Sequence, residues 1–145
     1  MAKRVVVTGM GVISPIGNDV PTFWNNLVNG VCGIDYIQEF PTKNLPVRIA
    51  GKVKDFHPEN YGMDKGFSRK QDLFTQYGVA AAYEAMNQAG LIAEGEGQNI
   101  DPFRLGVYVG SGIGGFEIQY RETAKMIEDP SGQWISPLFI PTMIS

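Results

Sequence analysis

A short apolar run that ends in a glycine-rich loop constrains this chain more than any other feature. Residues 105–109 are mostly apolar, a pattern typical of a buried strand. Four of the next six residues are glycines: Gly110, Gly112, Gly114 and Gly115. Because glycine has no side chain and tolerates positive φ, this loop predicts that bare backbone lies close to another group. The sequence therefore predicts a functional site at the end of this strand.

The same loop matches the dinucleotide-binding pattern G-x-G-x-x-G between Gly110 and Gly115. That fold needs a second strand that ends in an acidic residue, about 20 residues beyond the glycines. Glu128 and Asp129 lie near that distance, but their surroundings indicate the end of a helix followed by a turn at Pro130. A nucleotide-binding α/β domain is therefore kept only as the weaker functional alternative.

Composition and charge restrict the class of protein. The chain has 145 residues, of which 43% are hydrophobic, and it shows no repeat or linker, so we expect residues 1–145 to belong to a single domain. Its net charge is −3, which argues against nucleic acid or an anionic membrane as partner. No apolar run approaches the ~18 residues of a membrane span, and no signal peptide is evident. We therefore expect a cytoplasmic protein.

The chain contains one cysteine and one histidine, which limits its chemistry. Cys32 follows the predicted helix stop at Gly30 and is expected to be a buried structural thiol. His57 stands beside Pro58 and is expected in a loop. Neither context indicates a nucleophile or a base, and two such residues cannot form a metal cluster. We expect no catalytic residue, no metal site and no cofactor in these residues.

Predicted strands and helices alternate along the chain, which is typical of an α/β fold. The longest predicted helix repeats alanine every fourth residue at Ala81, Ala85 and Ala89, so its alanine face predicts close packing against a neighbour. Residues 141–145 resemble the first turn of an uncompleted helix, and we expect the chain to be part of a longer protein. The other predicted elements are a strand over residues 4–12, a helix from Pro21 to Gly30, an outlying strand within 47–53, a capping box at 68–71 that opens the long helix, a stop at Gly90 and a helix after the glycine loop.

Several spaced motifs occur in a fixed order along the whole chain. They are residues 5–17, Phe23-Trp24 with Leu27, Gly33-Ile34, residues 69–74, the glycine loop 110–115 and residues 136–141. Their order resembles the β-ketoacyl-acyl-carrier-protein synthases, most closely the type II elongating enzyme of bacterial fatty acid synthesis. The resemblance implies a thiolase-like α/β fold, with helices on both faces of a mixed, mostly parallel sheet. The chain would supply the N-terminal part of its first half.

The resemblance also implies a reaction and its partners. Enzymes of this family condense an acyl thioester with malonyl-acyl-carrier-protein, act as homodimers and bind acyl carrier protein. Their chemistry uses a cysteine nucleophile and two histidines, which in the family lie beyond the point that corresponds to residue 145. Cys32 and His57 match none of these positions, so no catalytic residue is carried over.

Two side chains match positions that shape the acyl pocket in the family. Ile113, within the glycine loop, corresponds to a gate of the pocket, and Phe139 corresponds to a dimer-interface residue that helps to line the partner's pocket. The loop glycines would let the gate move as the acyl chain enters. The plainer alternative is that both side chains only fill the core.

A basic cluster of Lys65, Arg69 and Lys70 precedes the longest predicted helix. Positive charges near a helix N-terminus oppose the helix dipole, so their clustering suggests a role outside the fold. The family match implies docking of the acidic carrier protein, more securely for Arg69 and Lys70 than for Lys65. The alternative is a solvated face whose charge Asp72 offsets.

A non-catalytic relative that pairs with an active subunit, or a fragment kept for dimerisation, is the rival functional hypothesis. It predicts Gln or Ala where the enzyme has its nucleophile. A cysteine in a helix-capping turn soon after residue 145 would favour the enzyme instead.

Overall fold

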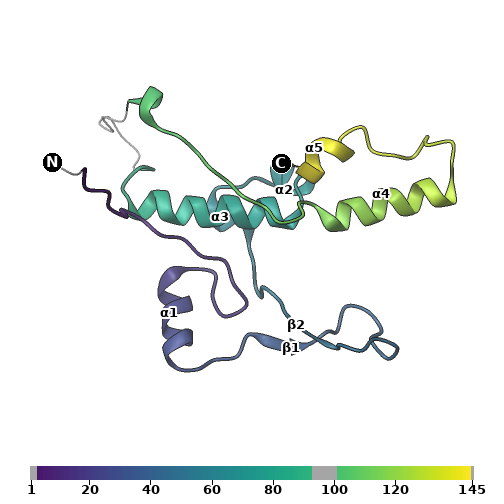
Figure 1. Ribbon diagram of the computed structural model, residues 1–145, viewed down its shortest axis with the longest axis horizontal. Helices are drawn as coiled ribbons and strands as arrows, with labels where there is room; N and C mark the ends of the chain where they lie inside the picture. Colours follow the sequence, from purple (N-terminus) through teal and green to yellow (C-terminus); the bar gives the residue numbers. More distant parts are fainter. Residues whose placement is uncertain (1–2, 93–100, 145) are drawn as a thin grey trace. The chain divides into compact units, whose positions relative to one another are not determined.

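The computed structural model describes residues 3–92 and 101–144, in which helices predominate (Figure 1). The chain divides into two compact units, one made of residues 1–57 and 80–93 and the other of residues 58–79 and 94–145. The longest helix, α3 (Leu73–Gln88), contributes its first two turns to the second unit and the remainder to the first.

The first unit begins its regular structure with α1 (Val20–Val28). Asp19 caps this helix by accepting a hydrogen bond from the amide of Thr22 at 2.7 Å. Pro21 lies in the first turn, and Gly30 adopts a φ of 68° just beyond the helix end. Pro21 and Gly30 are the local signals that predicted the helix. Its stop at Gly30 is confirmed, and it begins at Val20, one residue before the predicted start at Pro21.

A short antiparallel hairpin follows, made of β1 (Ile34–Tyr36) and β2 (Ile49–Gly51). Ile34 lies opposite Gly51, and Tyr36 lies opposite Ile49. β2 falls inside the outlying strand predicted within residues 47–53, whereas β1 lies in a stretch for which the sequence predicted no element.

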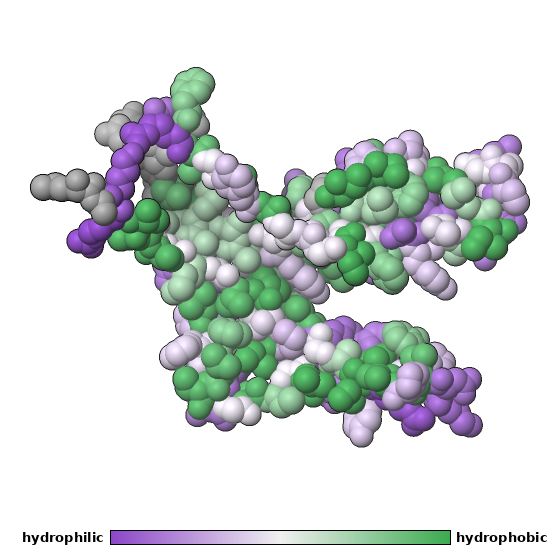
Figure 2. All heavy atoms as spheres, in the orientation of Figure 1, coloured by the Kyte–Doolittle hydropathy of each residue, from purple (hydrophilic) through white to green (hydrophobic). Residues whose placement is uncertain are grey.

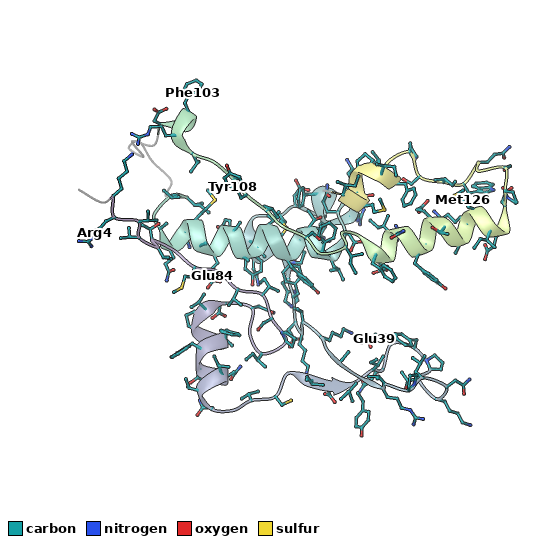
Figure 3. All side chains as sticks on the ribbon, in the orientation of Figure 1. Arg4, Glu39, Glu84, Phe103, Tyr108 and Met126 are labelled. Atoms are coloured by element: carbon teal, nitrogen blue, oxygen red, sulfur yellow. The ribbon has the colours of Figure 1, made fainter. Side chains whose placement is uncertain are left out.

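The two predicted apolar strands differ from expectation. Residues 4–12 and 105–109 join no ladder among the described residues, where the hairpin is the only named sheet. Their side chains are open to solvent: Val5 is 94% exposed, and Tyr108, labelled in Figure 3, is fully exposed. Apolar strands need a paired strand to bury them, and neither segment pairs with a strand in the described part of the chain. The expected mostly parallel sheet is therefore not formed there.

The predicted close packing of the alanine face is confirmed. A Cβ built on Gly9 would overlap the carbonyl oxygen of Ala85, and one built on Gly11 would overlap that of Ala81. Only bare backbone fits at these two points. Residues 9–12 therefore run directly against α3.

Glu84 adds polar contacts to the same interface (Figure 3). Its two carboxylate oxygens accept hydrogen bonds from the amides of Val12, at 2.9 Å, and Val20, at 2.7 Å. Because Val20 is the first residue of α1, this one side chain connects α3 to both the N-terminal segment and α1.

The second unit is helical. Its α2 (Lys65–Lys70) is capped by Asp64, which accepts a hydrogen bond from the amide of Phe67 at 2.7 Å. Ser68 lies inside α2, and its hydroxyl donates to the carbonyl of Asp64 at 2.9 Å. The predicted capping box at residues 68–71 is therefore wrong, because Asp64 starts a separate short helix before α3. The remaining elements are η1 (Pro58–Tyr61), η2 (Pro102–Arg104), α4 (Phe116–Glu128) and α5 (Phe139–Ile144).

Few side chains are fully buried. Among the described residues the buried apolar side chains are Met63, Ala80 and Ile118. Apolar groups are correspondingly frequent on the face shown in Figure 2. No helix within residues 3–92 and 101–144 has the length and apolar character needed to cross a membrane.

Candidate functional site

The turn between α2 and α3 is held by one buried amide. Gln76 is 7% exposed, and its Nε2 donates to the carbonyls of Ser68 at 2.9 Å and Gln71 at 3.0 Å. These bonds occupy carbonyl groups at the end of α2, where a helix has no internal partners. Gln76 thereby fixes the position of the backbone that carries Arg69 and Lys70.

The three predicted docking residues all lie on α2 and are exposed. Lys65 is its first residue, whereas Arg69 and Lys70 occupy its last turn. The dipole argument made from the sequence is therefore wrong for Arg69 and Lys70, because positive charges at a helix C-terminus are stabilised by about 0.3–1 kcal/mol. It still holds for Lys65.

The glycine loop approaches α5 closely at two of its four glycines. Gly114 has a φ of 81°, and an added Cβ would overlap the carbonyl oxygen of Met143. Gly115 is buried and donates its amide to that same carbonyl at 2.8 Å. The predicted approach of bare backbone is confirmed at these two positions. At Gly110 and Gly112 an added Cβ would meet no described atom within 4 Å.

The two predicted acyl-pocket residues lie at either end of this arrangement. Ile113 immediately precedes the close contact and is 74% exposed, so it fills no hole among the described residues. Phe139 is the first residue of α5 and is half-buried. The helix α5 therefore carries Phe139 in its first turn and contacts the glycine loop next to Ile113 through Met143.

Glu122 is the most deeply buried charged residue of the described chain, at 1% exposure. One carboxylate oxygen accepts from Lys125 at 2.7 Å, and the other accepts from the backbone amide of Ser136 at 2.8 Å. The bonds from Lys125 and then Ser136 hold the pKa of Glu122 below its ordinary value, so the carboxylate is ionised at neutral pH. Sequence reasoning missed Glu122, because its partner Ser136 lies 14 residues further along the chain.

A cavity of about 380 Å³ brings the predicted groups together. Its lining includes Arg69 and Lys70 from α2, Glu122 from α4 and Phe139 from α5. Asp72 also lines it, and one of its carboxylate oxygens is buried without a hydrogen-bond partner among the described residues. Two docking candidates and one acyl-pocket candidate thus share one cavity. Lys65 instead borders a separate hollow of about 290 Å³ together with Met63 and Arg69.

The single cysteine lies away from these groups in the sequence and is not buried. Cys32 is exposed in the loop between α1 and β1, where its thiol lies 3.8 Å from the carbonyl oxygen of Ile34. The expected buried thiol is therefore wrong, because the Cys32 side chain is exposed in this loop. Within residues 3–92 and 101–144, no group of three or more His, Cys, Asp or Glu side chains is placed to hold a metal ion.

Two solved structures that resemble this chain contain ketosynthases. One is the ishigamide ketosynthase/chain length factor, with a TM-score of 0.72 and 26% identity over 95% of this chain and 33% of that one. Another is a chain of a complex described as a type II PKS acyl-carrier protein in complex with its ketosynthase bound to the hexaketide. That match has a TM-score of 0.70 and 29% identity, and it covers 100% of this chain and 37% of the other. This chain therefore shares its fold with the matched part of these ketosynthase structures.

Sequence comparison defines the family. Residues 2–145 match the family model described as beta-ketoacyl synthase, N-terminal domain. The chain belongs to the beta-ketoacyl synthase family. It is 45% identical over 143 residues to 3-oxoacyl-[acyl-carrier-protein] synthase 2 of Staphylococcus aureus (strain COL), and 44% identical over 142 residues to the synthase of the same name in Vibrio cholerae. Each match covers 98% of this chain and 33% of the relative, so the chain spans about one third of these relatives' length.

Proposed function

We propose that a protein carrying this chain at the full length of its relatives is a 3-oxoacyl-acyl-carrier-protein synthase. The observation that carries this proposal is the 45% identity, over 98% of the chain, to a synthase of that name. The two compact units would then be parts of one condensing-enzyme domain. The test is to incubate the full-length protein with acyl and malonyl thioesters of acyl carrier protein and to identify the 3-oxoacyl product by mass. Absence of that product in a folded preparation would refute the proposal.

The reaction has two stages, an acyl transfer and a decarboxylative condensation. An acyl group passes from its carrier thioester to an enzyme cysteine, releasing the carrier thiol. Malonyl-acyl-carrier-protein then loses carbon dioxide, and the resulting carbanion attacks the acyl-enzyme carbonyl and expels the cysteine thiolate. These steps need an activated thiolate and donors that stabilise the oxyanion. The residues of this chain would support them by docking the carrier and shaping the acyl pocket.

The carrier would bind the exposed basic residues of α2. The cavity that Arg69 and Lys70 share with Phe139 supports this assignment, because it lies between the docking helix and the proposed pocket lining. A similar ketosynthase has been solved in complex with its acyl-carrier protein. We further propose a homodimer, in which Phe139 of each subunit helps to line the acyl pocket of the other.

Reversing both basic residues at the end of α2, by Arg69→Glu and Lys70→Glu together, should raise KM for carrier-bound substrates about tenfold or more at low salt. Charges at the rim of an interface act mainly on association, and salt screens them. The effect should therefore shrink as salt rises. Turnover of small thioesters that lack the carrier should be unchanged.

The matched control for this docking test is Lys3→Glu with Arg4→Glu, a second adjacent pair of exposed basic residues. If both substrate types lose activity equally, or if the control pair gives the same increase in KM, the carrier does not dock on α2.

Enlarging the proposed gate by Ile113→Phe should lower kcat/KM for long acyl chains while sparing two-carbon primers. An aromatic ring adds volume that a packed pocket absorbs only at a cost of about 1–3 kcal/mol, which corresponds to roughly 5- to 150-fold in rate. Kinetics with a series of acyl-chain lengths would measure this, with Ile113→Val as the smaller control. Equal losses at every length would show that Ile113 does not gate the pocket.

The second candidate function is that of a non-catalytic subunit that pairs with an active one. The similarity to a ketosynthase/chain length factor supports this candidate. The two candidates differ at the nucleophile position beyond residue 145. Cysteine there, together with product formation by the isolated protein, supports the enzyme. Gln or Ala there, with activity only after addition of a catalytic partner, supports the pairing subunit.

A further inference from the structure

We propose that Glu122 is a positioning residue that sets the place of α5 and thereby the acyl-chain-length preference of the enzyme. The inference rests on the proposed condensing function, because the groups that α5 carries matter to chain length only in that reaction. It starts from a buried anion on α4 that the reaction itself does not use.

The hydrogen bonds of Glu122 reach from α4 to the start of the segment that carries Phe139. Glu122 accepts the amide proton of Ser136, which lies 14 residues further along the chain. Lys125 neutralises the same carboxylate from the next turn of α4. A buried carboxylate with these donors has a fixed orientation, because any rotation leaves a charge or an amide without a partner.

Ser136 passes this constraint to the first turn of α5. Its carbonyl accepts from the amide of Phe139 at 2.9 Å, and its hydroxyl accepts from the amide of Leu138 at 3.2 Å. Leu138 in turn accepts from the amide of Thr142 at 3.0 Å. A continuous series of hydrogen bonds therefore leads from Glu122 to the residue proposed to line the pocket.

The other end of α5 is held by the glycine loop. Met143 accepts the amide proton of Gly115, and the backbone of Gly114 lies directly against the same carbonyl. Because α5 has only six residues, a displacement of its first turn also moves its last. Glu122 thus fixes one rigid element that carries Phe139 and touches the loop bearing Ile113.

Two substitutions separate this role from general stability. Glu122→Met is close in size but has no acceptor for Ser136, whereas Glu122→Gln retains one. The matched control is Glu128→Met, at the exposed end of the same helix. In the full-length enzyme we expect Glu122→Met to change the ratio of kcat/KM for long and short primers by about tenfold, the scale of one methylene in an apolar pocket. Glu122→Gln should change it less, and Glu128→Met should not change it.

A second measurement does not depend on activity. Hydrogen exchange at the amides of Ser136 and Gly115 should accelerate together in Glu122→Met and remain at the wild-type rate in Glu128→Met. If Glu122→Met fails to fold, Lys125→Met, at a partly exposed side chain, must show the same direction of change in both measurements.

The proposal is overturned if kcat/KM falls by one factor at all chain lengths, or if Ser136 exchange accelerates while Gly115 exchange does not. A wild-type enzyme that forms no product refutes the condensing function, and with it the effect on chain length. The exchange experiment still decides whether Glu122 positions α5.

Discussion

The 145-residue chain on its own should form no detectable 3-oxoacyl product from acyl and malonyl thioesters. Its single cysteine, Cys32, is exposed in a loop and matches no nucleophile position of the family, whereas the condensing chemistry needs an activated thiolate.

 The chain also has a single histidine, His57. One histidine cannot supply the two that the family reaction uses. The measurement is a mass-spectrometric assay of the purified chain, with a full-length synthase as the positive control. The conditions should give at least about a thousand turnovers per hour for the control, which is the turnover rate of a slow enzyme.

Folding of the isolated chain bears on the same experiment. Val5, Val107 and Val109 are each more than 80% exposed, and apolar segments of this kind favour association when nothing covers them. We therefore expect the isolated chain to aggregate or to lack a sharp unfolding transition. Product formation by a sequence-verified preparation of the chain would contradict the prediction, whatever its state of folding.

Replacing Gly11 by alanine should destabilise the full-length protein strongly, whereas the same change at Gly78 should stabilise it. A Cβ on Gly11 would overlap the carbonyl oxygen of Ala81, which is helix backbone and cannot move aside. Overpacking of this kind costs about 1–3 kcal/mol and occasionally more. At Gly78, inside α3, an added Cβ meets no described atom within 4 Å. Alanine there should gain roughly 0.5–1 kcal/mol from its higher helix propensity.

The matched pair is measured as shifts in the urea midpoint of unfolding relative to the unchanged protein. The opposite signs are the essential result, because both variants add the same methyl group. If Gly11→Ala is as stable as the unchanged protein, residues 9–12 do not lie against α3 as described.

Local signals in the sequence predicted the elements that depend on neighbouring residues. Pro21 and Gly30 mark α1 because a helix start and stop are decided within a few residues. The capping box failed at Ser68 because Asp64, four residues earlier, caps a separate helix, and both residues are good caps. Cap type alone does not decide between two such starts.

The buried polar residues could not be found in the same way. Glu84 bonds to residues 64 and 72 positions away, and Glu122 bonds to one 14 positions away. Nothing in the surrounding sequence specifies such partners, since each depends on how distant segments meet. The order of the motifs, by contrast, identified the family without any knowledge of these contacts, and residues 2–145 match its model.

The hydrogen bonds that Glu84 accepts from two distant backbone amides have a consequence for synthesis of the protein. The amides of Val12 and Val20 find this acceptor 72 and 64 residues later in the chain. At about 5–20 residues per second, a ribosome takes roughly 3–14 s to add those residues. During that interval the valines of residues 5–7 have already been synthesised, but α3 has not. The segment that follows these valines therefore has no helix to pack against. The segment over residues 5–12 is therefore synthesised before the helix that receives it, and its valines stay uncovered during that time.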